Sequence, residues 1–183
     1  TYAVLDTARV TEIPQHRERI YIVACRDGEQ FDLSFSTHVE PKAVCDLMSS
    51  EEVAKRYYYS DSFRVWQTVL DGVTEHIETN AVYQLRMFRT HYIRRNKKQQ
   101  CPTLMANMGS GGHNVPLIRD DTGIRKLTPR ECFNLQGFPS HYKLDANLPD
   151  SALYRLAGNA VSVPVVQLIA NRLLEQFPPH VKF

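Results

Sequence analysis

The sequence lacks paired cysteines and long apolar runs, and each of these absences excludes a class of protein. Its four cysteines stand far apart, without a Cys-x-x-Cys pair and without a histidine at metal-ligand spacing: Cys25, Cys45, Cys101 and Cys132. The sequence therefore predicts free thiols in a reducing compartment and no metal site. No apolar run approaches the roughly 20 residues of a membrane span, and residues 1–12 lack the basic-then-apolar order of a signal peptide. We expect a cytoplasmic protein with no membrane partner.

The chain as a whole also has little excess of positive over negative charge. The net charge is +2 over 183 residues, so a nucleic-acid role would have to rest on a local cluster of charge. Such a cluster lies between residues 83 and 98, where arginines and lysines are interleaved with aromatic residues. A glycine-rich segment follows at residues 107–114, and its evident use is backbone freedom rather than packing. A solvated basic surface with no partner is the alternative interpretation of this region.

One continuous apolar run, residues 20–25, is typical of a buried strand of a parallel sheet. Few other segments resemble buried strands, so most of the sheet must come from residues absent from this chain. Just before the run stand Arg17 and Arg19, whose guanidinium groups would emerge at the edge of the strand. Their planar forks of donors suit a phosphate or the oxygen of a base. Surface ion pairing with Glu18 is the alternative.

The spacing of apolar residues predicts a first helix in the middle of the chain. It would begin at Ser49 or Ser50 and run to about Leu70, with Phe63, Trp66 and Leu70 as one apolar stripe. We expect this stripe to pack on a core rather than to bind a ligand.

Two further helices are predicted near the end of the chain. One begins with Thr128 as N-cap, Pro129 as its first residue and Glu131 three residues after the cap, and it ends before Gly137. The other begins near residues 162–164 and stops at residues 178–179, with an apolar face made of Val165, Val166, Ile169, Leu173 and Phe177. Cys132 lies inside the first of these helices, and we predict a packed thiol there.

In three places, and in the right order, the chain resembles the DNA cytosine-5 methyltransferase family. Residues 14–21 resemble the family's Gln-x-Arg-x-Arg motif, and residues 125–132 with 136–139 resemble its ninth motif. Residues 158–161, followed by Val163 and Pro164, resemble its tenth and last motif. Thr103, Leu104 and the glycine-rich segment after them also resemble the family's target-recognition domain, which lies between the eighth and ninth motifs.

The resemblance implies a reaction and a role for several residues. The reaction is transfer of a methyl group from S-adenosylmethionine to carbon 5 of a cytosine that has left the duplex, after a thiolate has added to carbon 6. By resemblance, Arg19 donates to O2 of the flipped base, with Arg17 supporting it nearby. Gly158, Asn159 and Ala160 would pass near the methionine end of the cofactor. Ala160 stands where serine is frequent in the family, and a simple turn before the last helix is the alternative interpretation.

The same resemblance implies that the basic and glycine-rich segments bind double-stranded DNA. The charges would neutralise phosphates, while a bare backbone approaches the groove and neighbouring side chains read base edges. The residues predicted to bind DNA are Arg86, Arg89, Arg94, Arg95, Lys97, Thr103, Asn107, Gly111, Gly112 and His113. The Gly-x-Gly-Gly order of the loop is not a cofactor-binding turn, because it follows a basic irregular stretch and the residues after it cannot open a helix.

The resemblance also implies that a part of the enzyme is missing. The family's nucleophilic cysteine stands in a Pro-Cys dipeptide, and none of the four cysteines follows a proline. The family's Glu-Asn-Val motif and its amino-terminal cofactor turn are absent as well. We therefore expect a chain that is inactive alone and needs the N-terminal half as its partner. This half would be a second subunit of a split enzyme or a preceding segment of a longer polypeptide.

The predicted fold class is α/β: an incomplete edge of a doubly wound S-adenosylmethionine-dependent methyltransferase sheet, a small irregular β-rich target-recognition domain and a C-terminal helix. Residues 1–47 would belong to the catalytic domain and 48–124 to the recognition domain. Residues 125–158 would form the ninth motif and hinge, and 159–183 a helix that returns to the catalytic domain. Two alternatives stay open: a non-catalytic, sequence-specific DNA-binding module and a fragment of an RNA cytosine-5 methyltransferase. A mere binder would need neither a base-holding arginine nor a cofactor lip.

Overall fold

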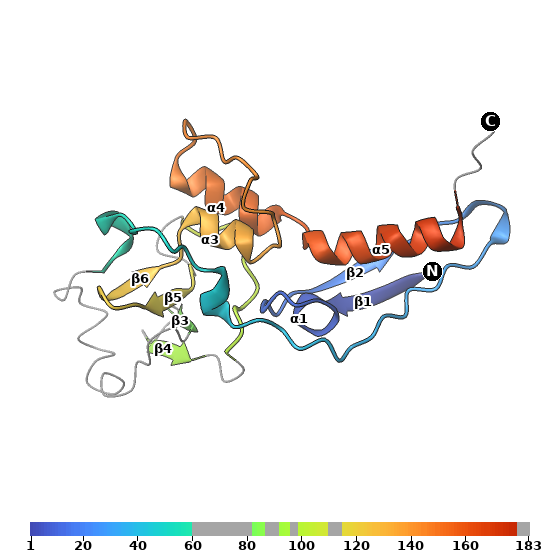
Figure 1. Cartoon of the computed structure of the whole chain (residues 1–183), viewed down its shortest axis with the longest axis horizontal. Coiled ribbons are helices and arrows are strands. Elements are labelled where there is room, and N and C mark those ends of the chain that lie inside the picture. Colours follow the sequence, from blue (N-terminus) through green and yellow to red (C-terminus); the bar gives the residue numbers. More distant parts are fainter. Residues whose placement is uncertain (60–81, 87–91, 96–98, 110–114, 179–183) are drawn as a thin grey trace.

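The computed structural model describes residues 1–59, 82–86, 92–95, 99–109 and 115–178. Its elements form two groups that lie side by side (Figure 1). One group, here called the hairpin unit, consists of a β-hairpin, a short helix and the last helix. The other group, here called the body, contains a four-stranded sheet and two helices.

The hairpin unit is built from β1 (Tyr2–Asp6) and β2 (Glu18–Ile22), which pair antiparallel with Tyr2 opposite Ile22. Between them lies α1 (Thr7–Val10), whose N-cap Asp6 accepts a hydrogen bond from the Ala8 backbone. The sequence predicted a strand in this place, but the expected parallel sheet is wrong for the described residues. The strand pairs with the segment just before it through a short connection, which only an antiparallel pair allows.

The two faces of the hairpin have different environments. Leu5 of β1 packs beneath α5 (Val163–Gln176), where Val165 and Ile169 are buried against it. On the opposite face four large apolar side chains alternate along the strands and are exposed by 59–72%; they are Tyr2, Val4, Ile20 and Ile22, here called the open face. The expectation of a buried strand therefore fails within this chain, because only one side of β2 is covered.

The body holds a sheet in the order β4-β3-β5-β6, with every neighbouring pair antiparallel. The strands are β3 (Val82–Arg86), β4 (Tyr92–Arg95), β5 (Leu117–Arg119) and β6 (Ile124–Lys126). After the sheet come α3 (Pro129–Asn134) and α4 (Asp150–Asn159), which pack on each other. Their shared core includes the fully buried Leu104, Met108, Leu127 and Tyr154.

The predicted helix from Ser49 is wrong over residues 49–59. Within that described stretch the backbone forms only a 3-10 turn at Lys55–Tyr57. The Ser49 N–H donates to the Glu131 side chain, and the Glu51 N–H donates to the Ser49 hydroxyl, a capping contact that no helical turn follows. Residues 60–70, including Phe63, Trp66 and Leu70, lie outside the described residues.

The start of α3 is confirmed in detail. The Thr128 hydroxyl accepts from the Glu131 N–H, and the Glu131 carboxylate accepts from the Thr128 N–H, which is the predicted capping box. Gly137 follows with φ +81, and a Cβ there would fall 2.3 Å from Cδ of Pro164. Glycine is therefore required where α3 meets the start of α5. The last helix is confirmed at Val163–Gln176, and its predicted face is buried at Val165 and Ile169. Val166, predicted for the same face, is instead 40% exposed.

The sequence did not predict α4, which occupies Asp150–Asn159. The stretch Asp150–Gln176 is apolar and long enough to cross a membrane by length and composition alone. In the structure it is two helices interrupted at residues 160–162. One packs on α3 and the other on the hairpin.

Candidate functional site

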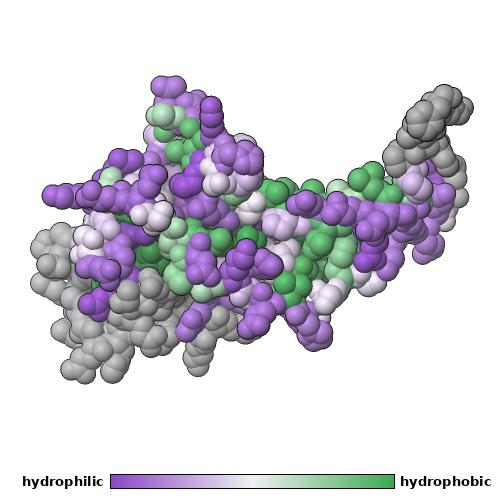
Figure 2. Space-filling model, in the orientation of Figure 1, coloured by the Kyte–Doolittle hydropathy of each residue, from purple (hydrophilic) through white to green (hydrophobic). Residues whose placement is uncertain are grey.

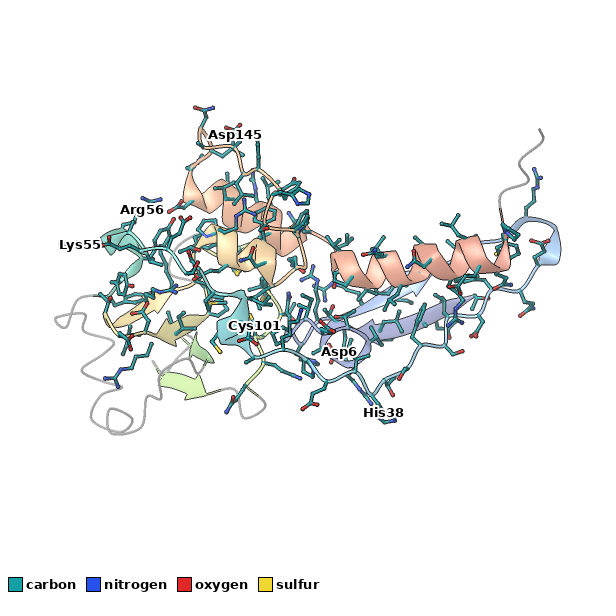
Figure 3. All side chains as sticks on the ribbon, in the orientation of Figure 1. Asp6, His38, Lys55, Arg56, Cys101 and Asp145 are labelled. Carbon is teal, nitrogen blue, oxygen red and sulfur yellow. The ribbon has the colours of Figure 1, made fainter. Side chains whose placement is uncertain are left out.

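Residues 14–17, the first half of the segment that resembles the Gln-x-Arg-x-Arg motif, lie between α1 and β2 and are fixed by Asp6. Oδ1 of Asp6 accepts from the Arg17 N–H at 2.9 Å, and its Oδ2 lies 2.7 Å from Nδ1 of His16. The next neighbour is Cys101, whose N–H donates to Pro14 at 2.7 Å and whose carbonyl accepts from the His16 N–H at 2.9 Å. Asp6 and Cys101 mark this junction of the hairpin unit with the body in Figure 3.

Arg17 is buried and hydrogen-bonded to backbone carbonyls on two other segments. Its guanidinium donates to Leu104 at 3.0 Å, to Gly158 at 3.1 Å and to Ala160 at 2.7 Å. Burial, and then the positive charge of Arg19, lower the pKa of Arg17 to about 10, so it remains protonated at neutral pH. The structure thus brings Arg17, a predicted catalytic residue, into contact with the predicted cofactor-binding residues 158–160, here called the cofactor lip.

Arg19 is exposed, and the described bond of its guanidinium is to the carbonyl of Glu18 at 2.7 Å. It stands opposite Leu5 in the hairpin, so it projects from the same face as Leu5, the face turned toward α5. Arg17 lies two residues earlier and is close enough for the charge of Arg19 to affect it. The two guanidinium groups therefore lie near each other, and that of Arg17 is bonded to Gly158 and Ala160.

The predicted cofactor lip forms the end of α4 and the link to α5. Gly158 is buried, and a Cβ on it would fall 2.3 Å from the Met105 carbonyl carbon and oxygen. This position therefore needs glycine for close packing with the body. Asn159 is exposed, and Ala160 caps α4 by donating its N–H to Leu156 at 2.9 Å. An exposed amide at the helix end is compatible with a polar small molecule approaching there. Ser162, also at this link, is fully buried, and its Oγ has no partner among the described residues.

Of the residues predicted to bind DNA, Thr103 and Asn107 are placed near this site. The Thr103 hydroxyl donates to the His16 carbonyl at 2.7 Å, and Asn107 is exposed. Arg86 lies in β3, and Arg94 and Arg95 lie in β4 at the edge of the four-stranded sheet. The remaining predicted positions lie outside the described residues: Arg89, Lys97, Gly111, Gly112 and His113.

Two buried glutamines were not singled out from the sequence. The Gln15 side chain donates to Leu135 at 2.6 Å and accepts from the Leu104 N–H at 3.3 Å. The Gln136 side chain donates to Ala157 at 2.7 Å. Both lie inside the segments that carry the motif resemblance, but their partners are far away in sequence, so no local pattern shows the role.

A second unpredicted cluster joins the sheet of the body to α3. The Arg125 guanidinium makes two bonds to the buried Glu131 carboxylate, at 2.8 and 2.9 Å, and a third to Asp120 at 2.6 Å. Burial would lower the pKa of Arg125, but its bonds to Glu131 and Asp120 outweigh burial and raise that pKa. Ser49 is tied to the same carboxylate. The cluster thus holds three segments of the body together.

Two of the four cysteines are poorly suited to act as nucleophiles. Cys101 and Cys132 are fully buried, and burial raises the pKa of both thiols. A thiol that stays protonated is a weak nucleophile. The packed thiol predicted at Cys132 is confirmed, and within the described residues no three His, Cys, Asp or Glu side chains gather as a metal site would require.

Comparison with curated proteins shows relatives over nearly the whole chain. The chain is 42% identical to the type II methyltransferase M.Bsp6I of Bacillus sp. (strain RFL6), over 94% of its own length and 54% of that protein. It is 28% identical to M1.ScrFI of Lactococcus lactis subsp. cremoris, over 95% of this chain and 43% of that one. M.HpaII of Haemophilus parainfluenzae is 30% identical, with 90% and 48% covered. The chain thus spans about half the length of the curated relatives it matches.

Solved structures show the same fold at low identity. The S. pombe Dnmt2 methyltransferase superposes with a TM-score of 0.59 at 18% identity, covering 97% of this chain and 56% of that one. Entamoeba histolytica EhMeth gives 0.58 at 16%, with 98% and 54% covered. The chain therefore has an α/β methyltransferase fold. The family model for C-5 cytosine-specific DNA methylases matches residues 1–175, and the chain belongs to that family.

Proposed function

We propose that the chain is the target-recognition and C-terminal part of a DNA (cytosine-5)-methyltransferase. The enzyme would transfer a methyl group from S-adenosylmethionine to carbon 5 of a cytosine flipped out of a specific duplex site. One observation supports this most strongly: Arg17 and Arg19 lie near each other, and Arg17 is bonded to Gly158 and Ala160. The proposed base-holding residue, Arg19, thus has as its near neighbour a residue that is bonded to the proposed cofactor lip, as a shared site would require.

Arg19 is the residue of this chain that would hold the base. Its exposed guanidinium offers several N–H donors in one plane, which suits the O2 of a cytosine and stabilises negative charge that develops on the ring. S-adenosylmethionine, when bound, supplies the methyl group, and the exposed Asn159 with Gly158 and Ala160 would line its methionine end. Arg17 is buried away from any such ligand and would support the lip rather than touch the base.

The nucleophilic thiolate would come from the N-terminal half, which is the proposed partner. The open face offers a place for that half, because four large apolar side chains are exposed on one side of a two-stranded sheet. A hairpin covered on only one face is a marginal structure in water. Helices of the N-terminal half would pack on the open face, and its strands would join an edge of the hairpin to form a larger, doubly wound sheet. Such an enzyme would act on DNA in the cytoplasm of a bacterium.

The recognition role would fall to residues 48–124, with residues 1–47 and 159–183 belonging to the catalytic domain and 125–158 between them. Thr103 is bonded to His16, next to Arg17, so the proposed DNA segment begins beside the proposed active site. Asn107 follows on the surface. Arg86, Arg94 and Arg95 would neutralise phosphates along the strands of the sheet, and Arg89, Lys97, Gly111, Gly112 and His113 would extend the same surface.

Complementation tests the proposal. The chain is mixed with the portion of M.Bsp6I that lies outside its match to this chain, and methyl transfer from labelled S-adenosylmethionine to duplex DNA is measured. We expect transfer by the mixture and none by either part. Transfer by this chain alone would contradict the assignment. DNA binding without any transfer, in a mixture shown to associate, would favour the non-catalytic module, and transfer to RNA but not DNA would favour the RNA enzyme.

A further inference from the structure

We infer that Arg17, Gln15 and Gln136 form a positioning node that fixes the start of the recognition segment, residues 103–106, against the cofactor lip, residues 158–160. The inference rests on the proposed function. It adds that the side of the site that would hold DNA and the side that would hold the cofactor are one rigid unit within this chain. Catalysis would then depend on residues that touch neither ligand.

The two sides are in direct backbone contact. A Cβ at Gly158 would lie 2.3 Å from the Met105 carbonyl and 2.5 Å from the Ala106 nitrogen, distances that no side chain tolerates. These partners are backbone atoms rather than the flexible end of a side chain. Because residue 158 is glycine, the backbone of the lip packs directly on the backbone of the recognition segment. Such close packing leaves no space for one segment to move relative to the other.

Arg17 links the same two segments through hydrogen bonds of its guanidinium group. One nitrogen of its guanidinium donates to Leu104, and the other donates to both Gly158 and Ala160, at 2.7–3.1 Å. The planar shape of the group fixes the angle between these bonds, so it sets the relative position of three carbonyls at once.

The two glutamines form a second link beside the first. Gln15 accepts from the Leu104 N–H and donates to Leu135 and to the Gln136 side chain. Gln136 then donates to Ala157, at the end of α4, and its backbone carbonyl accepts from the Val163 N–H, at the start of α5. Leu104 is thus joined to both ends of the lip through buried amides that are 0% exposed.

Burying the Arg17 side chain in the node lowers the stability of the folded chain, which points to a functional reason for the node. Arg17 is 4% exposed, and in the described part of the chain its side chain bonds only carbonyls, with one nitrogen, Nε, left without a partner. Burying a charge without an opposite charge opposes folding. Apolar side chains of similar volume would pack the junction with less cost, but they would not set the angle and distance between the two segments.

Methyl transfer gives such a fixed distance a use. The reacting atoms must approach within a narrow range, and a displacement of about 1 Å can slow a reaction about 100-fold. A loosened node would still allow each ligand to bind its own side, while the base and the methyl donor would be out of register. The signature is a lower kcat with nearly unchanged KM values.

The test uses the complemented enzyme described above with Arg17→Lys and, separately, Gln136→Met. Lysine keeps the charge but loses the planar fork, and methionine keeps the volume but loses the bond to Ala157. Arg172→Lys, in an exposed ion pair with Asp32, is the matched control. The rate of methyl transfer is measured at saturating DNA and cofactor, at a temperature well below the unfolding temperature of each variant. Each rate is then divided by the number of sites that bind S-adenosylhomocysteine.

We expect kcat per binding site to fall at least about tenfold in both node variants, with KM for DNA and for cofactor within about threefold of the parent and no change in the control. Unchanged kcat per site in either variant, with only a lower unfolding temperature, would show a merely structural role and overturn the inference. A fall confined to Arg17→Lys would also overturn it, since Arg17 would then act without the glutamines. If the parent complex transfers no methyl group, the proposed function fails and the inference fails with it.

Discussion

The body and the hairpin unit differ in how they bury their apolar residues. The body closes around one core, with Leu104, Leu127 and Tyr154 at most 1% exposed. The hairpin unit buries one face of β1 and β2 under α5 and leaves the open face in water. Apolar residues also gather on the surface along α5 and the hairpin in Figure 2. The comparison teaches that the described part of the body surrounds a core of its own, whereas the hairpin unit leaves one face that the proposed N-terminal half would cover.

The largest effect on stability is expected in the body, from Arg125→Met. The change leaves the Glu131 carboxylate buried without its cation and should cost about 3–5 kcal/mol of unfolding free energy. Arg172→Met in the hairpin unit removes an exposed ion pair and should cost less than about 1 kcal/mol. Chemical denaturation of both variants measures the difference. Equal losses would show that the body does not depend on its buried cluster.

Substitutions on the open face should weaken association with the N-terminal half and leave the stability of the isolated chain nearly unchanged. Val4→Asp with Ile20→Asp places two carboxylates where we expect the N-terminal half to pack, which should cost roughly 3 kcal/mol of association, or about a 100-fold loss of affinity. The stability of the isolated chain should hardly change, because both positions are already exposed. Leu148→Asp, at an exposed position in the body, is the matched control. Calorimetry measures the affinity of each variant for the complementing part of M.Bsp6I. Undiminished affinity of the Val4→Asp, Ile20→Asp variant would mean that the open face is not the interface.

A moderate effect is expected at the connection between the two regions. Gly137→Ala adds a Cβ against Pro164 at a residue with φ +81, so both contact and backbone oppose it. We expect a loss of about 1–3 kcal/mol. Gly28→Ala, with φ +75 and open space around the glycine, carries the backbone strain without the contact. Thermal unfolding compares the two variants, and an equal loss would remove the role of Pro164.

The smallest effect concerns pH. Burial of Asp120 would raise its pKa, but the hydrogen bonds from Arg125 and Tyr58 outweigh burial and lower it. A carboxyl whose pKa is depressed by folding contributes stability above its unfolded pKa and loses that contribution as the pH falls through its folded pKa. The stability difference between the parent and Asp120→Asn, under about 1 kcal/mol, should therefore be present at pH 7 and shrink as the solution becomes more acidic than pH 4. A difference that grows on acidification would contradict this sign.

Local sequence signals were sufficient where they act within a few residues. The capping box at Thr128 and Glu131 predicted the start of α3, and the apolar spacing with Pro164 predicted α5. α4 was missed because Gly158 and Asn159 suggested a turn. The glycine is helical, and its reason is contact with Met105, which lies 53 residues earlier in the sequence.

Other features could not be predicted because their causes lie elsewhere. The apolar run at residues 20–25 indicated burial, but Ile20 and Ile22 are exposed among the described residues, on the face that the proposed N-terminal half would cover. The Ser49 backbone bonds to Glu131, 82 residues away, and no local pattern shows a contact over that distance. The role of Arg17 was predicted from its motif, yet its three partners are 87 to 143 residues distant. Motif resemblance pointed to both arginines, and the fold adds that Arg17 is bonded to residues 158–160 whereas Arg19 is exposed.

Arg19→Ala in the complemented enzyme tests the central claim most directly, because Arg19 is the group of this chain that would touch the reacting base. Single-turnover transfer of a labelled methyl group to duplex DNA is measured with Arg19→Ala and, as control, Arg172→Ala. Loss of a donor to developing charge is expected to slow transfer by about 100- to 1,000-fold, while the control stays within about twofold of the parent. Undiminished transfer by Arg19→Ala would contradict the account.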